Sequence, residues 1–270
     1  MIFLVTALFE EAKPFINFYK LKPVNDGRFT IFENADSWLK LCVTGPGQVA
    51  CASALSHMLT LYGASRTDFV VNVGTCAGSA PVGSLFLINK ITDQATGRTY
   101  FPDVIYQHNF SESAIITSDT PVNGTASEAG SLVDMESSAL YQAATLFVNT
   151  DRVIMLKIVS DNFDGSTVSR DLVSKLIDSQ LAPITDFIAR LAGMPSEEAA
   201  IDESLAARLT ADLCCSAVME GQLLQYLTYA SLSGLDYTAI IDTMYEEGRL
   251  PCANRKEGKL SLEYFKQQII

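Results

Sequence analysis

Three groups of polar residues stand out because each one directly follows a short apolar run of the chain. They are Glu10-Glu11, the turn at 74–78 and Ser160-Asp161-Asn162. Carboxylates beside hydroxyls and a glycine turn can transfer protons and accept hydrogen bonds from hydroxyl groups. Each acid also has an ordinary structural role, as a cap after a strand or as a first-turn helix residue.

A glycine turn at Gly45-Pro-Gly-Gln-Val-Ala50 fits the fingerprint of dinucleotide-binding proteins. That fingerprint also needs an acidic residue at the end of the following strand, where it holds a ribose. Asp68 is the only nearby acid, and it begins that strand instead of ending it. The pattern therefore disfavours a nicotinamide cofactor and predicts a tight turn at the start of a helix.

The elements that must position these groups alternate between strand-like and helical patterns up to residue 193. This alternation predicts an α/β fold, a mixed central sheet flanked by helices, with a site at the carboxyl ends of the strands. The expected strands are 2–7, 29–32, 38–43, 68–73, 84–91, 114–116 and 153–158, and the expected helices are 10–18, 49–62, 135–147 and 168–192.

The residue pattern changes at Gly193-Met194-Pro195-Ser196. Glycine, proline and then serine predict a linker followed by the start of a new helix. Only helical patterns follow, at 201–232, 237–247 and 260–270. We therefore expect two parts, an α/β domain over 1–193 that carries the three polar groups and an all-helical C-terminal module of unknown role over 196–270.

The composition limits the classes of function. Of the 270 residues 48% are hydrophobic, which predicts a globular chain. The formal net charge is -12, which makes nucleic acid an unfavourable main partner. No apolar run is long enough for a membrane span, and the start has no basic leader, which predicts a cytoplasmic protein. Six cysteines without CxxC spacing and only two histidines argue against disulfides and a metal site, and we expect no cofactor.

Three longer motifs converge on one family. Val71-Asn-Val-Gly-Thr-Cys-Ala-Gly-Ser79, Val133-Asp-Met-Glu-Ser-Ser-Ala-Leu-Tyr141 and Lys157-Ile-Val-Ser-Asp161, in this order, resemble the purine nucleoside phosphorylase/nucleosidase superfamily. Thr6-Ala-Leu-Phe-Glu-Glu11 and Thr117-Ser-Asp-Thr-Pro-Val-Asn-Gly124 are similar to its 5'-methylthioadenosine/S-adenosylhomocysteine nucleosidase branch. The resemblance covers about 1–192 and implies cleavage of the N-glycosidic bond of a purine nucleoside.

The resemblance also implies roles for individual residues. Asp161 would protonate the purine at N7, because a purine leaves poorly as an anion. Glu136 would accept hydrogen bonds from the ribose hydroxyls, and Glu11 would orient and deprotonate the attacking water, although adjacent Glu10 competes with it for the position facing the site. The further substrate contacts implied are Met135, Thr75, Cys76, Gly78, Pro121, Val122 and Ser160.

Two features favour water over phosphate as the nucleophile. The turn at 6–11 has no arginine and two carboxylates that would repel phosphate, and Asn72 stands where hexameric phosphorylases carry an arginine. Arg98 is the residue that could supply an anion site instead. A phosphate-dependent phosphorylase is therefore the first alternative.

A non-catalytic nucleoside-binding or regulatory protein is the second alternative, and the retention of all three acids argues against it. The stretches 91–117 and 124–134 are shorter than in typical nucleosidases, so the substituent at the 5' position of the sugar is left open. Because members of the family often complete their site from a neighbouring subunit, we expect a homo-oligomer.

Overall fold

Strand β1 (Ile2–Thr6) lies inside a mixed sheet and is buried along its whole length. Its sequence, Ile-Phe-Leu-Val-Thr, is typical of a strand covered on both faces. It pairs in parallel with β4 (Leu39–Val43) on one side and β5 (Phe69–Ala77) on the other. These pairings bring the ends of β1 and β5 to the same edge of the sheet.

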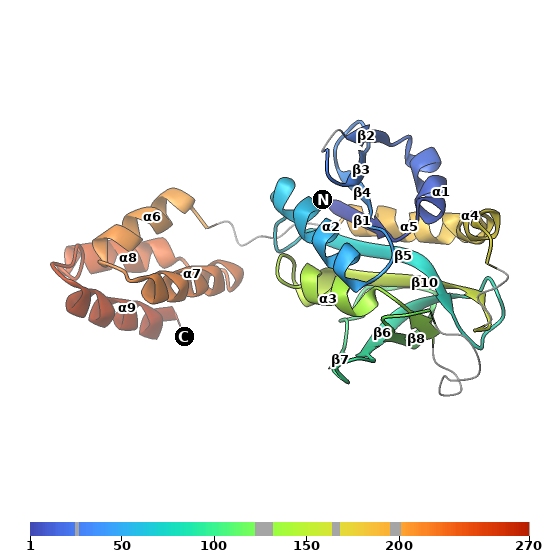
Figure 1. Cartoon of the computed structure of the whole chain (residues 1–270). Helices are drawn as coiled ribbons and strands as arrows, with labels where there is room; N and C mark the ends of the chain where they lie inside the picture. The colour runs from blue at the N-terminus through green and yellow to red at the C-terminus, as the bar shows by residue number, and fades with distance from the viewer. Residues whose placement is uncertain (25–26, 122–131, 164–167, 195–200, 270) are drawn as a thin grey trace. The chain divides into compact units, whose positions relative to one another are not determined.

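The structure, a computed structural model, describes residues 1–24, 27–121, 132–163, 168–194 and 201–269. The chain divides into two units, Met1–Ser196 and Glu197–Ile270 (Figure 1). The first unit holds the sheet, and the second is helical.

The sheet closes on itself at one side. Strand β10 (Val153–Asp161) pairs with both β5 and β6 (Leu85–Asp93), and β6 connects back to β5 through β8 (Ser111–Thr117) and β9 (Leu132–Asp134). On the other side, the sheet continues from β1 through β4 to β3 (Thr30–Glu33) and β2 (Lys22–Val24), while β7 (Thr99–Tyr100) pairs with β6.

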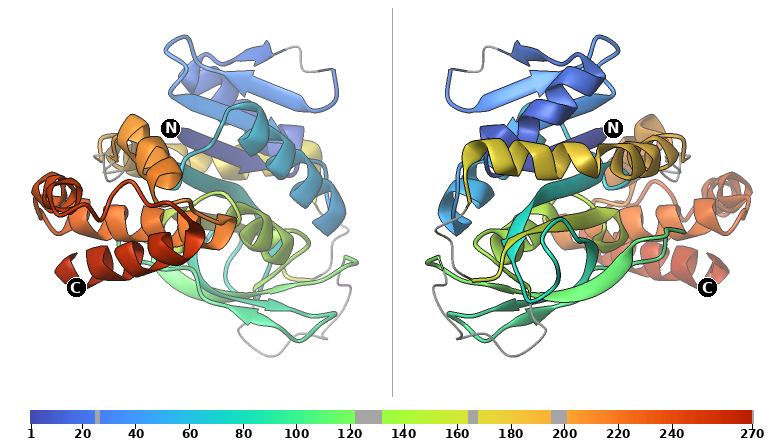
Figure 2. Two further views of the ribbon diagram at one scale, coloured as in Figure 1. Left: turned by 90° about the vertical axis from the view of Figure 1, so that its left-hand side faces the viewer. Right: turned by 90° about the vertical axis from the view of Figure 1, so that its right-hand side faces the viewer.

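Helices cover both faces of this sheet (Figures 1 and 2). Helices α2 (Gln48–Leu61) and α3 (Ser137–Ala144) share one apolar core with the sheet. Helices α1 (Phe9–Tyr19), α4 (Arg170–Ser179) and α5 (Leu181–Ala192) share the core on the opposite face. The predicted α/β class, with a mixed central sheet flanked by helices, is confirmed.

Several boundaries differ from those predicted. The single helix expected over 168–192 is two helices, because the chain turns at Gln180 and Pro183 then fits the first turn of α5. Strands β2, β7 and β9 were not predicted, since two or three residues carry no periodic signal. Residues 150–152 form a short 3-10 turn before β10.

The second unit contains α6 (Glu203–Asp212), α7 (Ala217–Leu232), α8 (Tyr237–Glu246) and α9 (Arg255–Ile269) around its own apolar core. The helix expected over 201–232 is interrupted at Cys214, which adopts a positive φ of 50°, and Ser216 then caps α7. Within the described residues, no helix combines the length and apolar character needed to cross a bilayer.

Gly258 lets α9 pack directly against the end of α6. A Cβ atom at this position would lie 1.7 Å from the carbonyl oxygen of Leu213, at the end of α6. No side chain tolerates that distance, so α9 reaches α6 only because residue 258 is glycine.

We therefore expect Gly258→Ala to destabilise the second unit by about 1–3 kcal/mol, the usual cost of overpacking. Urea unfolding followed by circular dichroism measures the change. Gly221→Ala is the matched control, because a Cβ there meets open space within α7 and should stabilise the helix by about 0.5–1 kcal/mol. Equal stability of the Gly258→Ala variant and the unmodified protein would contradict this packing.

Candidate active site

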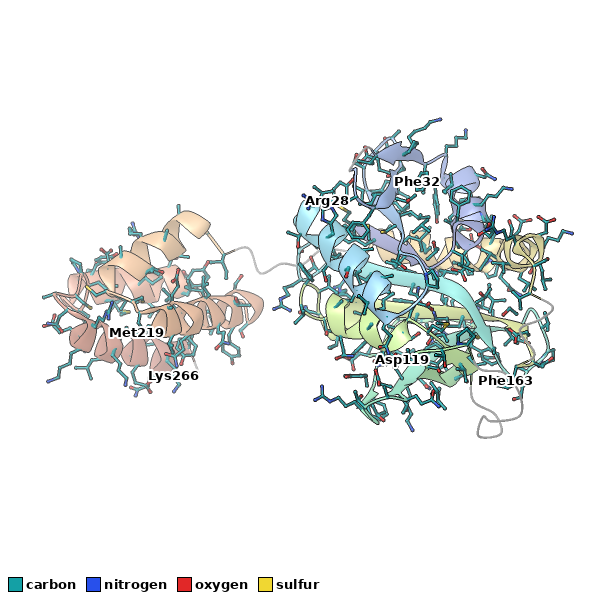
Figure 3. The ribbon with its side chains drawn as sticks, in the orientation of Figure 1. Arg28, Phe32, Asp119, Phe163, Met219 and Lys266 are labelled. Atoms are coloured by element: carbon teal, nitrogen blue, oxygen red, sulfur yellow. The ribbon has the colours of Figure 1, made fainter. Side chains whose placement is uncertain are left out.

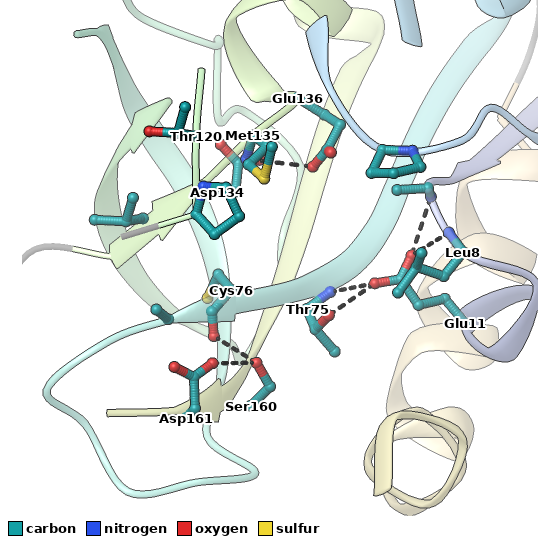
Figure 4. A pocket seen from close by; sticks show the side chains of 15 residues that line it. Leu8, Glu11, Thr75, Cys76, Thr120, Asp134, Met135, Glu136, Ser160 and Asp161 are labelled. Atoms are coloured by element: carbon teal, nitrogen blue, oxygen red, sulfur yellow. Dashed lines mark hydrogen bonds between the residues drawn. The ribbon is translucent and has the colours of Figure 1, made fainter. Parts of the chain in front are cut away.

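A cavity of about 210 Å³ lies at the carboxyl ends of β1, β5 and β10 (Figure 4). The structure brings together in its wall eight of the residues singled out from the sequence: Glu11, Thr75, Cys76, Pro121, Met135, Glu136, Ser160 and Asp161. They come from five separate segments of the chain, which meet because the sheet aligns the strand ends.

Glu11, and not Glu10, faces the cavity. Its side chain is buried, whereas Glu10 pairs with exposed Arg170 at 3.5 Å. One carboxylate oxygen, Oε2, accepts hydrogen bonds from the backbone amides of Ala7 and Leu8, both at 3.0 Å. The start of α1 thus supplies both the carboxylate and the donors that hold it, with the helix dipole favouring its negative charge.

The other oxygen of Glu11, Oε1, contacts Thr75. The backbone amide of Thr75 donates to it at 2.7 Å and the hydroxyl donates at 2.9 Å. Three backbone donors therefore fix the carboxylate, while the Thr75 hydroxyl is the one donor able to rotate toward a ligand. Gly74 permits this approach, because a Cβ there would lie only 3.3 Å from Oε1.

Glu136 reaches the cavity from the residue preceding α3. The backbone amide of Gly47 donates to its Oε1 at 2.7 Å. Gly47 has a φ of 96°, a conformation that suits glycine and lets the turn before α2 aim this amide at the carboxylate. Burial, and next the negative charge of Asp134, raise the pKa of Glu136 above its ordinary value.

Asp161 lies at the end of β10. The Ser160 hydroxyl lies 2.8 Å from its Oδ1 and 3.2 Å from the carbonyl oxygen of Cys76, so it links the two strand ends. The backbone of Asp161 accepts a hydrogen bond from the Gly78 amide at 3.0 Å. Neighbouring Asn162 donates to the carbonyls of Gly78 and Ala80, which holds the loop against β10.

A buried ion pair beneath the cavity is the main feature that the sequence reading missed. Lys157 on β10 is 1% exposed, and its Nζ lies 2.9 Å from Oδ2 of Asp134, which lines the cavity. Asp134 also accepts hydrogen bonds from Thr117 and Ser137. A lysine within the apolar run 153–159 was the available signal, because a buried ammonium requires a carboxylate partner.

The charge of Lys157 is maintained by its surroundings. Burial by itself would lower the pKa of the ammonium, but Asp134, Glu136 and Glu11 outweigh it and raise the pKa above the usual value. One cation therefore stabilises a group of buried carboxylates around the cavity.

The remaining predicted residues lie elsewhere. Gly78 does not line the cavity; a Cβ there would lie 2.6 Å from Leu132, so glycine allows β9 to pack on β5. Arg98 is exposed in the turn between β6 and β7, away from the cavity wall, and Asn72 is buried in the sheet, where it donates to the carbonyl of Val5 at 3.0 Å. Val122 lies outside the described residues.

No set of three or more His, Cys, Asp or Glu side chains is arranged to hold a metal ion in the part of the chain that the structure describes. The cavity instead presents carboxylates, hydroxyls and apolar surface. Such a wall can take a small, uncharged or cationic molecule that offers hydroxyl groups and a flat apolar part.

Sequence comparison gives no relatives: no family model matches the chain, and no curated protein matches it. Solved structures do match. The chain is similar to 5'-methylthioadenosine/S-adenosylhomocysteine nucleosidase from Neisseria meningitidis in complex with methylthio-immucillin-A, at 17% identity and a TM-score of 0.57, covering 69% of this chain and 98% of that one.

Two further solved structures match over similar shares of both chains. Arabidopsis thaliana 5'-methylthioadenosine nucleosidase is 20% identical, with a TM-score of 0.57 and 72% and 96% of the two chains covered. Futalosine hydrolase of Helicobacter pylori is 12% identical, with a TM-score of 0.56 and 70% and 97% covered. The chain therefore has the fold of these nucleosidases, as the motifs predicted.

The Lys157 ammonium can be tested by replacing it with an apolar side chain. We expect Lys157→Met to destabilise the first unit by about 3–5 kcal/mol, because it leaves Asp134 buried without its counter-ion. Chemical denaturation measures the loss, and Lys175→Met, at an exposed position of α4, is the control that should change little. Adding Asp134→Asn to Lys157→Met should restore part of the stability; no restoration would argue against the pair.

Glu136 should make stability depend on pH. Because its folded-state pKa is raised above the ordinary value of 4.5, the folded state is progressively disfavoured as pH rises from 4.5 through the folded-state pKa. Glu136→Gln removes this contribution. The free energy of unfolding of the variant, minus that of the unmodified protein, should therefore increase with pH over that range. Denaturant midpoints measured from pH 4 to 8 check this, and a difference that does not vary with pH would refute it.

Proposed function

We propose that the first unit hydrolyses the N-glycosidic bond of a purine nucleoside, releasing the free base and the ribose. The observation that carries this proposal is the convergence of Glu11, Glu136 and Asp161 on one cavity at the strand ends. Three carboxylates at different points of the wall match the three tasks of the reaction: protonating the base, holding the sugar and activating water.

Asp161 protonates the departing base. The purine leaves well only when N7 gains a proton, and a carboxyl group beside the base can supply it. The Ser160 hydroxyl, 2.8 Å from Oδ1 of Asp161, orients the carboxyl group.

Glu136 and Met135 hold the sugar. A carboxylate can accept hydrogen bonds from two ribose hydroxyls at once, and the Gly47 amide fixes the position of Glu136. Met135 lines the wall beside it and offers apolar contact to the ribose ring. As the bond breaks, the ribose gains positive character, which nearby carboxylates stabilise.

Glu11 orients the attacking water and takes its proton. Rotation of the Thr75 hydroxyl away from Oε1 frees one acceptor position on the carboxylate for that water. The backbone amides of Ala7, Leu8 and Thr75 keep the carboxylate in place during the exchange.

Water is favoured over phosphate by the charge of the wall. The described residues of the wall include four acids, Glu11, Asp134, Glu136 and Asp161. None of the described wall residues is Lys, Arg or His. The sequence from 118 to 133 also has no basic residue. A phosphate dianion would meet these acids without a basic side chain in the described wall to bind it, because the buried Lys157 is already paired with Asp134.

The solved structures support the substrate class. They include nucleosidases for 5'-methylthioadenosine and S-adenosylhomocysteine and a futalosine hydrolase. A 5'-modified purine nucleoside is accordingly the substrate class that we propose to test first.

We further propose that the first unit forms a homo-oligomer and works in the cytoplasm. Two exposed apolar side chains favour a protein contact on one side of the sheet: Val49 in α2 is 82% exposed, and Leu146, just after α3, is 73% exposed. None of the six cysteines forms a disulfide in the structure, as suits a reducing compartment.

The central test is base release with and without phosphate. The protein is incubated with adenosine, inosine, 5'-methylthioadenosine and S-adenosylhomocysteine, and free base and sugar are quantified by chromatography. We expect base and free ribose at a rate independent of phosphate. Phosphate-dependent formation of ribose 1-phosphate would establish the phosphorylase alternative, and tight binding without turnover would establish the non-catalytic one.

The proposed acid can be tested separately. We expect Asp161→Asn to lower turnover by ~10²–10⁴-fold, because an amide keeps the shape of the side chain but cannot donate the N7 proton. Asp178→Asn, at an exposed position of α4, is the matched control and should retain full activity. Near-normal turnover by Asp161→Asn, with unchanged circular dichroism, would assign Asp161 a structural role only.

A further inference from the structure

The helical unit carries exposed charges that its own helices do not favour. Six basic residues lie between 197 and 270: Arg208, Arg249, Arg255, Lys256, Lys259 and Lys266. Three are engaged within the unit, since Arg208 lies over the Tyr245 ring, Arg249 pairs with Glu247 at 2.6 Å, and Lys266 pairs with Glu263 at 3.4 Å. The other three, Arg255, Lys256 and Lys259, are exposed at the start of α9, and we call them the basic face.

The basic face opposes the electrostatics of α9. Arg255 and Lys256 occupy the first turn, where the amides of the helix N-terminus present positive charge, and Lys259 follows in the second turn. Glu257 is the acid in this first turn, and its carboxylate accepts hydrogen bonds from Ala253 and Asn254. Arg255 and Lys259 are also four residues apart, a spacing at which like charges repel across a helix turn. Among the described residues, no ion pair compensates any of the three.

Helix α8 shows the opposite arrangement. Asp242 and Glu246 are exposed, four residues apart, and lie in the last two turns, where the helix carbonyls present negative charge. We call these two residues the acidic face. Each face thus carries a local electrostatic cost that an external charge of opposite sign would relieve, and such local conflicts are typical of functional surfaces.

The two faces do not neutralise each other within one unit. Helices α8 and α9 pack together, yet no ion pair joins their two charge sets in the described residues. Leu260, beside Lys259, is 67% exposed and gives the basic face an apolar centre. A charged rim around an apolar side chain is the usual composition of a protein interface.

We propose that the helical unit binds a second copy of itself, with the basic face of α9 in one copy contacting the acidic face of α8 in the other. Charge complementarity between the two faces identifies this occupant. A chain with net charge -12 is a poor ligand for nucleic acid, whereas a second copy supplies the required acidic surface. Because the faces differ, two copies can exchange both contacts reciprocally or extend head to tail. The far end of α9, marked by Lys266 in Figure 3, lies outside the contact.

The test uses the full chain in sedimentation velocity at 50 and 500 mM NaCl. At 500 mM NaCl the contacts between exposed charges are screened, so the helical units should separate. The molar mass should then fall to the value that association of the first unit alone produces. Lys256→Glu/Lys259→Glu and Asp242→Lys/Glu246→Lys should each weaken association about tenfold or more at 50 mM NaCl. An equimolar mixture of the two variants should restore association at 50 mM NaCl, because the reversed faces are again complementary. Circular dichroism confirms that both variants are folded.

A matched control separates the faces from total charge. Lys256→Gln/Lys259→Gln and Gln267→Glu/Gln268→Glu lower the net charge equally on the same helix, and only the first should weaken association. Three results would overturn the proposal: a mass insensitive to salt and to both reversals, an effect of one reversal without the other, or a mixture that does not reassociate. The last two would mean that a face contacts some other surface, such as the first unit.

Discussion

The buried ammonium of Lys157 is the interaction on which the candidate site depends. Acids gathered in a partly buried cavity repel one another and resist ionisation. The cation beside Asp134, together with the backbone amides directed at Glu11 and Glu136, offsets that cost. These donors belong to the strand ends and helix starts themselves, so the folded backbone and the arrangement of charges form together.

Three of the four acids in the described wall, Glu11, Glu136 and Asp161, could be predicted from the sequence because each sits in a recognisable context, a strand end or a helix start. Their partners could not. The Gly47 amide reaches Glu136 across 89 positions of the sequence, and the Thr75 amide reaches Glu11 across 64. Lys157 was overlooked because the surrounding run reads as an ordinary apolar strand, and only the structure places Asp134 opposite it.

The fold shows the same division. The longer strands and α2 followed from apolar periodicity, which is a local property of the chain. Short strands such as β9, and the pairing of β10 with both β5 and β6, depend on contacts between distant segments. The break between α6 and α7 depends on the positive φ of Cys214, for which that residue type gives no warning.

The sheet also limits where its backbone can accept another strand. With β10 bonded on both sides, that strand offers no free backbone edge, and the margin beyond β1 ends in β2, which has only three residues. That strand begins with Lys22 and Pro23. A lysine on a sheet edge disfavours pairing with another strand, and proline has no amide hydrogen to donate. Both β10 and β2 thus discourage growth by strand addition. The association between copies proposed above uses helix surfaces instead, where side-chain charge, and not backbone hydrogen bonding, selects the partner.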